Sequence, residues 1–425
     1  MTLLISVLLT VSAMFTMDNI NYSIANNEAT VVYSPKAKGE VTIPSTIRYK
    51  GGTYPVVAIA DSAFFDVYEV TAINLPRSIS KIGGFAFFNT SVKEPIFTKT
   101  IFAYLPYEYK GKYEIPKSIT EITAGAFCGC ADLTAVELPK KVEKIGGYAF
   151  LATGITKPVS SDTHFAYLPI EYKGKYSIPK GVTTISDGAF FGCEELTRVD
   201  IPSTVTEIGA GAFKMCSNLD SVILPPSVTI IKPNTFDGCK KLIYVSLPER
   251  LEEICAYAFN ECSWLSRIDF TKTTIISIGD YAFYGCIALQ KAELQEGLTN
   301  IGTYAFNQCN DLHEVTIPQS VTMVGKETFG HTKVSTPLYS KTIFILLPES
   351  TTGTYTVPDG IETIAESAFA YCQRLESVVL PSSVKTIGNT AFRYSTIRSI
   401  NIPEGAKVGE AAFEGCKNLK GGSIN

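Results

Sequence analysis

The sequence predicts a β-rich solenoid, in which one short unit is repeated along the chain and the units stack on one another. A phrase of the form L-x-x-V-x-L-P-x-S-V-T-x-I-G-x-x-A-F-x-G-C-x-x-L recurs in phase through most of the 425 residues. The apolar positions near its beginning alternate with other residues, as a half-buried strand requires. A single coil of this kind cannot bury its apolar face, whereas stacked coils form one continuous core.

The phenylalanine of the A-F pair marks the phase of the repeat. Of the thirteen intervals between successive markers, eight are 23 residues long, three are 40, one is 24 and one is 21. A period of 23 lies within the range of about 20 to 29 residues that is typical of leucine-rich repeats. The markers are Phe64, Phe87, Phe127, Phe150, Phe190, Phe213, Phe236, Phe259, Phe283, Phe306, Phe329, Phe369, Phe392 and Phe413.

Each part of the phrase has a physical role. Proline after the strand lacks an N–H group, so it ends the ladder and turns the chain, as at Pro202 and Pro225. The Val and Ile of S-V-T-x-I point back inward, and the small Ala beside the Phe lets the ring enter the core. We therefore expect a curved, right-handed stack of coils with a parallel sheet on the concave face and short helical or 3-10 turns on the convex side.

The repeated phrase resembles the BspA-like leucine-rich repeats, also called the Treponema pallidum type. The resemblance covers about residues 40 to 420, and clear copies occur at 196–216 and 312–329. Common leucine-rich repeats carry Asn or Cys soon after the strand, whereas here the Cys follows the Phe. The resemblance implies surface adhesion, often to host or extracellular-matrix proteins or to other cells.

The three 40-residue intervals contain a normal coil plus 17 residues. These intervals carry the phrases IFAYLPYEYKGKYEIP from Ile101 to Pro116, HFAYLPIEYKGKYSIP from His164 to Pro179 and IFILLPESTTGTYTVP from Ile343 to Pro358. Each has an apolar strand, Leu-Pro, a polar turn with a glycine and a second strand that ends in Pro, which is the pattern of a β-hairpin. We therefore expect three β-hairpins inserted into the solenoid.

We divide the chain into three parts. Residues 1–17 resemble a secretory signal, because the apolar run from Leu3 to Phe15 is too short to span a bilayer and Val11-Ser12-Ala13 offers a cleavage site. Residues 18–58 form strand pairs that we expect to cap the first coil, and residues 59–425 form the solenoid of about fourteen coils. Only six residues follow Leu419, so we expect truncation, a partner at that end, or a poorly capped terminus.

Composition excludes several classes of function. The hydrophobic fraction of 45% and the charged fraction of 18% describe a folded protein, and the net charge is −4. Without a basic run, the sequence offers no support for binding nucleic acid or an anionic membrane. It contains no dinucleotide-binding, P-loop or H-E-x-x-H motif, and the three histidines, His164, His313 and His331, lie in different coils. We therefore expect no enzymatic activity, no cofactor and no transmembrane span in the mature chain.

Nine of the eleven cysteines occupy the Gly-Cys position or its equivalent. Stacking places them about 5 Å apart in neighbouring coils, within the distance that a disulfide spans. Stacked side chains point in the same direction, so we expect a ladder of buried thiols; disulfides and a metal site are the alternatives, with Cys128 and Cys255 off the ladder. The ladder positions are Cys130, Cys193, Cys216, Cys239, Cys262, Cys286, Cys309, Cys372 and Cys416.

The residues that flank the Val of L-x-x-V-x-L point outward and form columns across the stack. Solenoids commonly bind partners along such a sheet, and Tyr and Arg are typical anchors of interfaces. We expect a protein partner to bind there. The candidate residues are Arg198, Asp200, Tyr244, Arg267, Asp269, Lys291, Glu293 and Glu314, with Ser221, Ile223, Ser246 and Thr316 in the same columns.

The predicted hairpins offer a second candidate surface. Tyr109, Lys110, Tyr172 and Lys173 lie nearest the turns, where we expect them to be exposed. Tyrosine rings of this kind can stack on sugar rings, so glycan binding at the cell surface is an alternative function. A third interpretation is a structural spacer in a larger surface assembly.

Overall fold

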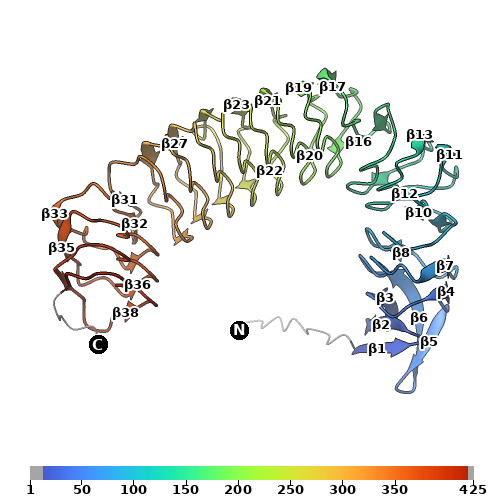
Figure 1. The fold of residues 1–425 in the computed structure, drawn as a ribbon, viewed down its shortest axis with the longest axis horizontal. Coiled ribbons are helices and arrows are strands. Elements are labelled where there is room, and N and C mark those ends of the chain that lie inside the picture. Colours follow the sequence, from blue (N-terminus) through green and yellow to red (C-terminus); the bar gives the residue numbers. More distant parts are fainter. Residues whose placement is uncertain (1–12, 420–425) are drawn as a thin grey trace, which may run out of the picture. The chain divides into compact units, whose positions relative to one another are not determined.

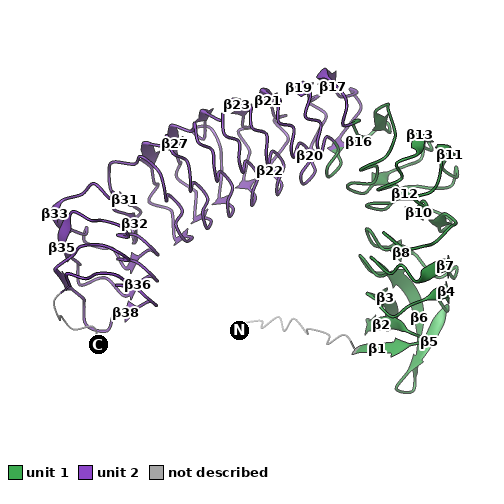
Figure 2. Ribbon diagram, in the orientation of Figure 1, with its two compact units in different colours: residues 1–169, 185–189 green, residues 170–184, 190–425 purple. Residues whose placement is uncertain are grey.

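A computed structural model describes residues 13–419 and contains only strands and turns in that range (Figure 1). The chain divides into two compact units (Figure 2). Unit 1 comprises residues 1–169 with 185–189, and unit 2 comprises residues 170–184 with 190–425. Each coil contributes strands to two parallel ladders, where the sequence had predicted a single sheet.

The first coil of unit 1 is preceded by a small sheet of order β1-β2-β3-β6-β5, in which β3 and β6 are parallel and the other pairs antiparallel. Phe15 on β1 stacks on Tyr22 and Tyr49, with ring centroids 5.6 and 4.4 Å apart. Strand β6 then pairs in parallel with β8, so the cap leads directly into the coils. The strands are β1 (Ala13–Met17), β2 (Ile20–Ala25), β3 (Glu28–Val32), β5 (Thr46–Tyr49), β6 (Gly52–Ile59) and β8 (Lys81–Ile82).

The first ladder consists of the L-x-x-V-x-L strands and their equivalents. All of its pairs are parallel, with neighbouring strands one coil apart in the chain. In unit 1 it contains β4 (Gly39–Thr42), β7 (Val70–Asn74), β11 (Gly111–Glu114) and β13 (Leu133–Glu137). In unit 2 it contains β17 (Gly174–Ser177), β19 (Leu196–Asp200), β21 (Ser221–Ile223), β23 (Tyr244–Ser246), β25 (Arg267–Ile268), β27 (Lys291–Glu293), β29 (Glu314–Thr316), β33 (Gly353–Thr356), β35 (Leu375–Val379) and β37 (Ser399–Asn401).

The second ladder consists of two- to four-residue strands around the T-x-I step, and its pairs between successive coils are also parallel. In unit 1 it contains β10 (Ile101–Tyr104), β12 (Glu121–Ile122), β14 (Lys144–Ile145) and β16 (His164–Tyr167), with β18 (Thr184–Ile185) spanning the boundary. In unit 2 it contains β20 (Glu207–Ile208), β22 (Ile230–Ile231), β24 (Glu253–Ile254), β26 (Ser277–Ile278), β28 (Asn300–Ile301), β30 (Met323–Val324), β32 (Ile343–Leu346), β34 (Thr363–Ile364), β36 (Thr386–Ile387) and β38 (Lys407–Val408).

The marker phenylalanines stack face to face through the core. In unit 2, the Phe213 and Phe236 rings lie 5.4 Å apart at an interplanar angle of 4°, and the Phe236 and Phe259 rings lie 5.2 Å apart at 12°. The rings from Phe64 to Phe283 and Phe306, Phe369 and Phe392 are almost completely buried. Each coil therefore fits the next at strand spacing because the same ring occupies the same place.

The turn that carries the phenylalanine requires two left-handed residues. In all fourteen coils, the residues two before and two after the marker have positive φ, for example Asn234 at 58° and Gly238 at 74°. These residues turn the backbone so that three N–H groups of each regular turn donate to carbonyls of the next coil: Asn234 to Ala256, Phe236 to Ala258 and Gly238 to Asn260. The turn is thus a third set of hydrogen-bonded rungs, and the last Gly of the A-F-x-G pattern falls at one of its two left-handed positions.

The predicted hairpins are wrong in their pairing. Strands β10 and β11 do not pair with each other; β10 pairs in parallel with β12 and β11 in parallel with β13. The Leu-Pro step carries the chain from one ladder to the other, so each phrase forms a shortened coil of its own. The antiparallel pairs precede the phrases, where β9 (Ile96–Phe97), β15 (Val159–Ser160) and β31 (Leu338–Tyr339) pair with β10, β16 and β32.

With three shortened coils added to the fourteen marked ones, the solenoid has about seventeen turns. The expected helical or 3-10 turns do not occur within residues 13–419. The left-handed residues on either side of each Phe break the succession of right-handed φ and ψ angles that a helical turn requires.

We predict that Phe236→Ala lowers the free energy of unfolding by about 3 to 5 kcal/mol, because it removes a fully buried ring and leaves a cavity between two others. Denaturant unfolding followed by circular dichroism measures this loss. Trp264→Ala is the control: this side chain is 55% exposed, so its loss should cost less than about 1 kcal/mol. Equal losses in the two variants would contradict the role assigned to the stack.

Candidate binding surface

The outward residues of the first ladder form two columns, which we call the strand face. The columns begin at Arg198 and Asp200 and end at Glu314 and Thr316. Register places Arg198 beside Ser221, Ser221 beside Tyr244 and Tyr244 beside Arg267. The alternate residues point inward and are buried, including Val222 and Val245. The predicted alternation is therefore present on these strands.

One predicted residue, Asp200, is neutralised by a lysine of the preceding coil. Lys175 Nζ lies 2.7 Å from Asp200 Oδ2, and the Ser177 hydroxyl donates to the same oxygen at 2.8 Å. The hydrogen bond from Lys175 lowers the pKa of the Asp200 carboxyl below its usual value. Asp200 therefore has a partner within the chain, which makes it a weaker candidate for contact with another molecule.

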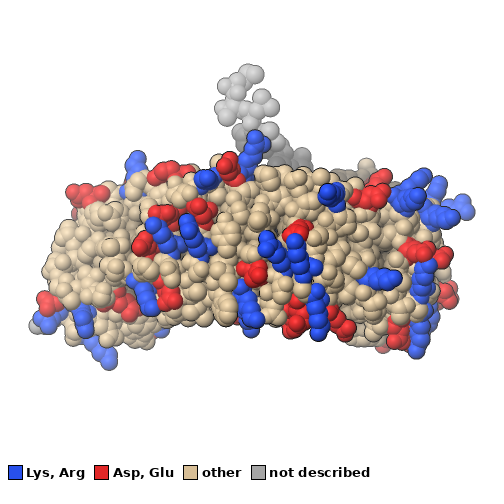
Figure 3. All heavy atoms as spheres, turned by 90° about the horizontal axis from the view of Figure 1, so that it is seen from above, with Lys and Arg blue, Asp and Glu red and all other residues tan. Residues whose placement is uncertain are grey.

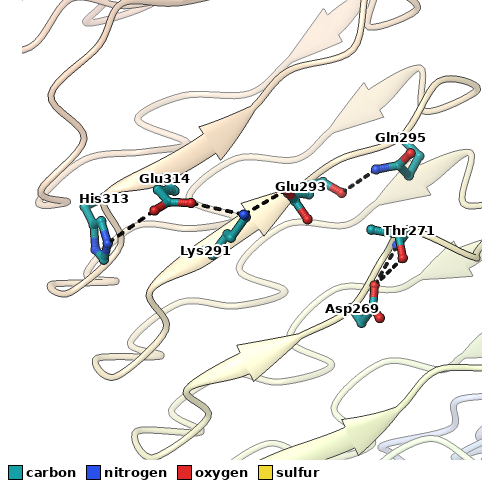
Figure 4. Close-up of polar contacts among 7 residues, drawn as sticks. All are labelled: Asp269, Thr271, Lys291, Glu293, Gln295, His313 and Glu314. Atoms are coloured by element: carbon teal, nitrogen blue, oxygen red, sulfur yellow. Dashed lines mark hydrogen bonds and ion pairs between the residues drawn. The ribbon is translucent and has the colours of Figure 1, made fainter.

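Lys291 lies between two carboxylates (Figure 4). Its Nζ is 2.8 Å from Glu293 Oε1 and 3.1 Å from Glu314 Oε2, while His313 Nε2 lies 3.9 Å from Glu314 Oε1. The hydrogen bonds with Glu293 and then Glu314 raise the pKa of the Lys291 ammonium. Such exposed pairs contribute little to stability, but they hold the long side chains in place across the strand face.

The first ladder of unit 2 is interrupted between β25 and β27, which belong to separate sheets. This coil is the one with a 24-residue interval, and it carries Phe270-Thr271 where other coils have Leu-Pro. Asp269 accepts hydrogen bonds from the backbone N–H and the hydroxyl of Thr271, at 2.9 and 2.6 Å. Both bonds lower the pKa of the Asp269 carboxyl, and the bond from the hydroxyl has the larger effect. The extra residue thus forms a local turn that separates the two strands.

A depression of about 510 Å³ lies at this interruption. It brings together four residues that the sequence had named separately, Arg267, Asp269, Lys291 and Glu293. Figure 4 shows the Asp269 turn and the Lys291 pairs on the neighbouring strands. The other lining residues are Ser266, Ile268, Phe270 and Gln290.

Among the described residues, Arg267 has no carboxylate within 4.0 Å, but its charge helps to lower the pKa of the Asp269 carboxyl. Two aromatic side chains lie in the same and the preceding coil: Trp264 is 55% exposed, and Tyr244, beside Arg267 in register, is 41% exposed. Trp264 is the chain's single tryptophan. The sequence prediction missed Trp264 because it precedes the strand, at a position where the neighbouring coils carry Lys241 and Ala288. Its residue type was the available signal.

Charges of both signs are mixed over the side of the molecule on which Figure 1 labels β19, β21 and β23 (Figure 3). Large areas between them are uncharged. The surface therefore offers local, alternating charges instead of the continuous positive field that nucleic acids attract.

The tyrosines of the shortened coils have partners inside the chain. Tyr109 and Tyr172 are half-buried, and their hydroxyls donate to the carbonyls of Lys112 and Lys175 at 3.0 Å. Their rings pack edge to face on Tyr113 and Tyr176, with centroids 5.2 and 5.3 Å apart. Lys110 lies 3.2 Å from Asp132, and Lys173 is exposed. These contacts give the tyrosines a structural role and leave less ring surface for a ligand.

The cysteine ladder is buried except at Cys416, and all eleven cysteines are free thiols. Each central thiol points to the phenylalanine carbonyl of the preceding coil: Cys239 Sγ lies 3.1 Å from Phe213 O, and Cys262 Sγ lies 3.1 Å from Phe236 O. The ladder thus supports the phenylalanine turns. Three coils carry threonine instead, at Thr90, Thr153 and Thr332, whose hydroxyls donate to the phenylalanine carbonyl of their own coil.

The histidines stay apart. His164 contacts the Thr163 hydroxyl at 3.0 Å, His313 contacts the Asp311 carbonyl at 2.8 Å, and His331 lines a separate cavity. Among residues 13–419, no group of three or more His, Cys, Asp or Glu side chains could hold a metal ion. In the same range, no helix has the length and apolar character needed to cross a membrane.

A family model described as the BspA type leucine-rich repeat region matches residues 40–153, 101–169, 161–276, 229–350 and 349–425. The chain belongs to this family. The resemblance seen in the repeated phrase is therefore confirmed, and it extends over the coils of both units. BspA-type chains are surface repeat proteins, which is consistent with a binding scaffold.

The chain is similar to several solved structures. A leucine-rich repeat protein from Bacteroides ovatus is 26% identical over 96% of this chain and 93% of that one, with a TM-score of 0.45. A leucine-rich cell surface protein from Faecalibacterium prausnitzii is 22% identical over 96% and 81%, with a TM-score of 0.34. The leucine-rich repeat protein of T. pallidum is 18% identical over 71% and 91%, with a TM-score of 0.22. A search of curated proteins found no match.

We predict that the thiol ladder makes the protein sensitive to alkali. Burial raises the pKa of Cys130, Cys193 and Cys372 from 9.0 to about 12. Because the folded state holds the protonated thiols, their contribution is fully present below about pH 9 and is lost as the pH rises toward 12. Denaturant unfolding between pH 8 and pH 12 measures this loss.

The matched variant is Cys372→Thr, which places at this position the residue that Thr332 provides in another coil. Its neutral hydroxyl does not ionise in this range, so its unfolding free energy should fall less steeply above pH 9 than that of the unmodified chain. Parallel curves for the two proteins would rule out a contribution from this thiol.

Proposed function

We propose that this chain is an exported, non-enzymatic scaffold that binds a protein partner through the strand face of unit 2. The observation that carries the proposal is the depression between β25 and β27, which Arg267 lines, together with the exposed Tyr244 that lies beside Arg267 in register. Arg, Tyr and Trp are the residue types that most often dominate the binding energy of protein interfaces. The partner then presents a carboxylate to Arg267 and an apolar side chain to Tyr244 or Trp264.

The remaining strand-face residues contribute complementarity. Lys291, Glu293 and Glu314 hold one another in fixed positions, so a partner meets an ordered pattern of charges. Charges at the edge of an interface chiefly set the association rate and its dependence on salt. A host or extracellular-matrix protein is the partner class that the family suggests.

Export rests on the segment that precedes the cap. Most of it, residues 1–12, lies outside the described range. Cleavage after Ala13 would leave Met14 as the first residue and would keep Phe15, whose ring stacks on Tyr22 and Tyr49. The proposal is thus compatible with an intact cap sheet.

We predict that the secreted form begins at Met14. Expression of the full chain in a bacterium with a general secretory pathway, followed by N-terminal sequencing of the extracellular protein, measures the start. A start at Met1 on protein confined to the cytoplasm would contradict export, whereas Ala13→Leu should block cleavage as the control.

We predict that Arg267→Glu combined with Lys291→Glu lowers capture of the binding partner at least tenfold. Recombinant protein is tested by pull-down against purified matrix proteins, and the captured protein is titrated by surface plasmon resonance at two salt concentrations. Lys180→Glu is the matched control, because it changes the same charge on an exposed residue outside the strand face.

Two results would replace this function. A glycan array signal that depends on Tyr109 and Tyr172, with no protein captured, would favour the glycan-binding alternative. If neither the pull-down nor the glycan array detects binding, the result would favour a structural spacer.

A further inference from the structure

The shortened coils leave a gap between the full coils on either side. In regular coils, the N–H group two residues after the marker donates to a carbonyl of the next turn, as Met215 does to Asp237 at 2.7 Å. A shortened coil keeps only the central rung, from Leu105 to Ala126 in the first copy and from Leu347 to Ala368 in the third. The N–H group of the preceding coil therefore faces no such carbonyl.

The first copy fills this gap with aromatic rings. Tyr107 places its hydroxyl against the Asn89 N–H, which donates to it in place of the absent rung. Its ring packs edge to face on Phe88 at 5.8 Å and on Tyr104 at 5.9 Å, and Phe88 in turn contacts Phe85 at 5.7 Å. The gap is thus closed by a cluster of four rings from the chain itself.

The third copy has the same backbone plan without these rings. Its marker Phe329 corresponds to Phe87 of the first copy. Counting from these markers, the positions of Phe85, Phe88, Tyr104 and Tyr107 are taken by Glu327, Gly330, Leu346 and Glu349. The N–H group that corresponds to that of Asn89 belongs to His331.

A cavity of about 460 Å³ lies at this place, and all four of these residues line it. Its walls include the apolar side chains of Val334 and Leu347 and the 46% exposed ring of Tyr371. Within the described residues, the His331 N–H has no hydrogen-bond acceptor. The volume is in the range of small-molecule sites, which is about 300 to 1,000 Å³.

The charges at the cavity are predominantly negative. Glu327 and Glu349 form no ion pair with a residue of the described range. Lys333 is engaged by Asp311 at 2.7 Å, and Glu366 by Lys326 at 3.4 Å. The two unpaired carboxylates therefore favour a ligand with a positive charge.

We propose that this cavity binds a phenol group that carries a neighbouring positive charge. The ring takes the place that Tyr107 fills in the first copy, and its hydroxyl oxygen accepts a hydrogen bond from the His331 N–H. The cationic group lies toward Glu327 and Glu349. A free phenol with an alkylamine side chain and a tyrosine within a basic peptide share this chemistry, and the site is separate from the strand face.

The test is isothermal titration calorimetry of the full chain with three probes. They are tyramine, phenethylamine, which lacks the hydroxyl, and the peptide Arg-Tyr-Arg. Tyramine should bind about fivefold more tightly than phenethylamine, the effect of one net hydrogen bond. Tighter binding of the peptide than of tyramine identifies a protein source for the ligand, and the reverse identifies a small molecule.

Glu349→Tyr restores the residue of the first copy and should abolish tyramine binding while raising the melting temperature. Thr351→Tyr is the matched control: it adds the same residue where the first two copies carry Tyr109 and Tyr172, outside the cavity, and should leave binding unchanged. If Glu349→Tyr does not fold, Leu346→Tyr is tested in its place. This variant restores the ring of Tyr104 and should likewise abolish tyramine binding.

Three results would overturn the proposal. They are an absence of binding by all three probes at millimolar concentration, equal affinity for tyramine and phenethylamine, and undiminished tyramine binding when Glu349→Tyr or Leu346→Tyr folds.

Discussion

The rest of the structure depends on the contact between phenylalanine rings of successive coils. Because the ring centroids of markers in directly adjacent full coils stay within about 4.6 to 5.9 Å, each of these coils must present its Phe at the same height and depth as its neighbours. That requirement explains the left-handed residues on either side of the marker, the small residue before it and the thiol that meets its carbonyl. The outward residues are free of this constraint, which leaves the strand face open to variation.

Candidate sites occur where the coil departs from its standard length. One extra residue in the 24-residue coil separates β25 from β27 and gathers Arg267, Asp269, Lys291 and Glu293 around a depression. A shortened coil supplies only one rung of the phenylalanine turn, and in the first copy the Phe85 N–H donates past it to the Ala124 carbonyl. The remaining gap is filled by rings in the first copy and left open in the third. In both places the surrounding coils are held by the core, so the opening is a stable feature of the fold.

The sequence predicted the repeat, its phase and its family because the apolar positions recur in register over many coils. It also predicted which residues of Leu196–Asp200 point outward, since strand alternation follows from the pattern alone. The pairing of Ile101–Tyr104 could not be predicted, because a strand-turn-strand phrase fits both a hairpin and a shortened coil. Deciding between them requires knowing which strand of the next coil lies alongside. The Arg267 depression and the His331 cavity depend on added or missing backbone; the 24- and 40-residue intervals mark these coils, but they do not show which gaps the side chains fill.

The inward positions build the fold, whereas we propose that partner binding is confined to outward residues of the first ladder. Hydrogen–deuterium exchange measured by mass spectrometry, with and without the captured partner, tests it most directly. We predict added protection in peptides covering the outward strands Tyr244–Ser246, Arg267–Ile268 and Lys291–Glu293, and unchanged exchange in the phenylalanine turns between them. Protection spread over the second ladder or the turns, with none at Arg267, would contradict it.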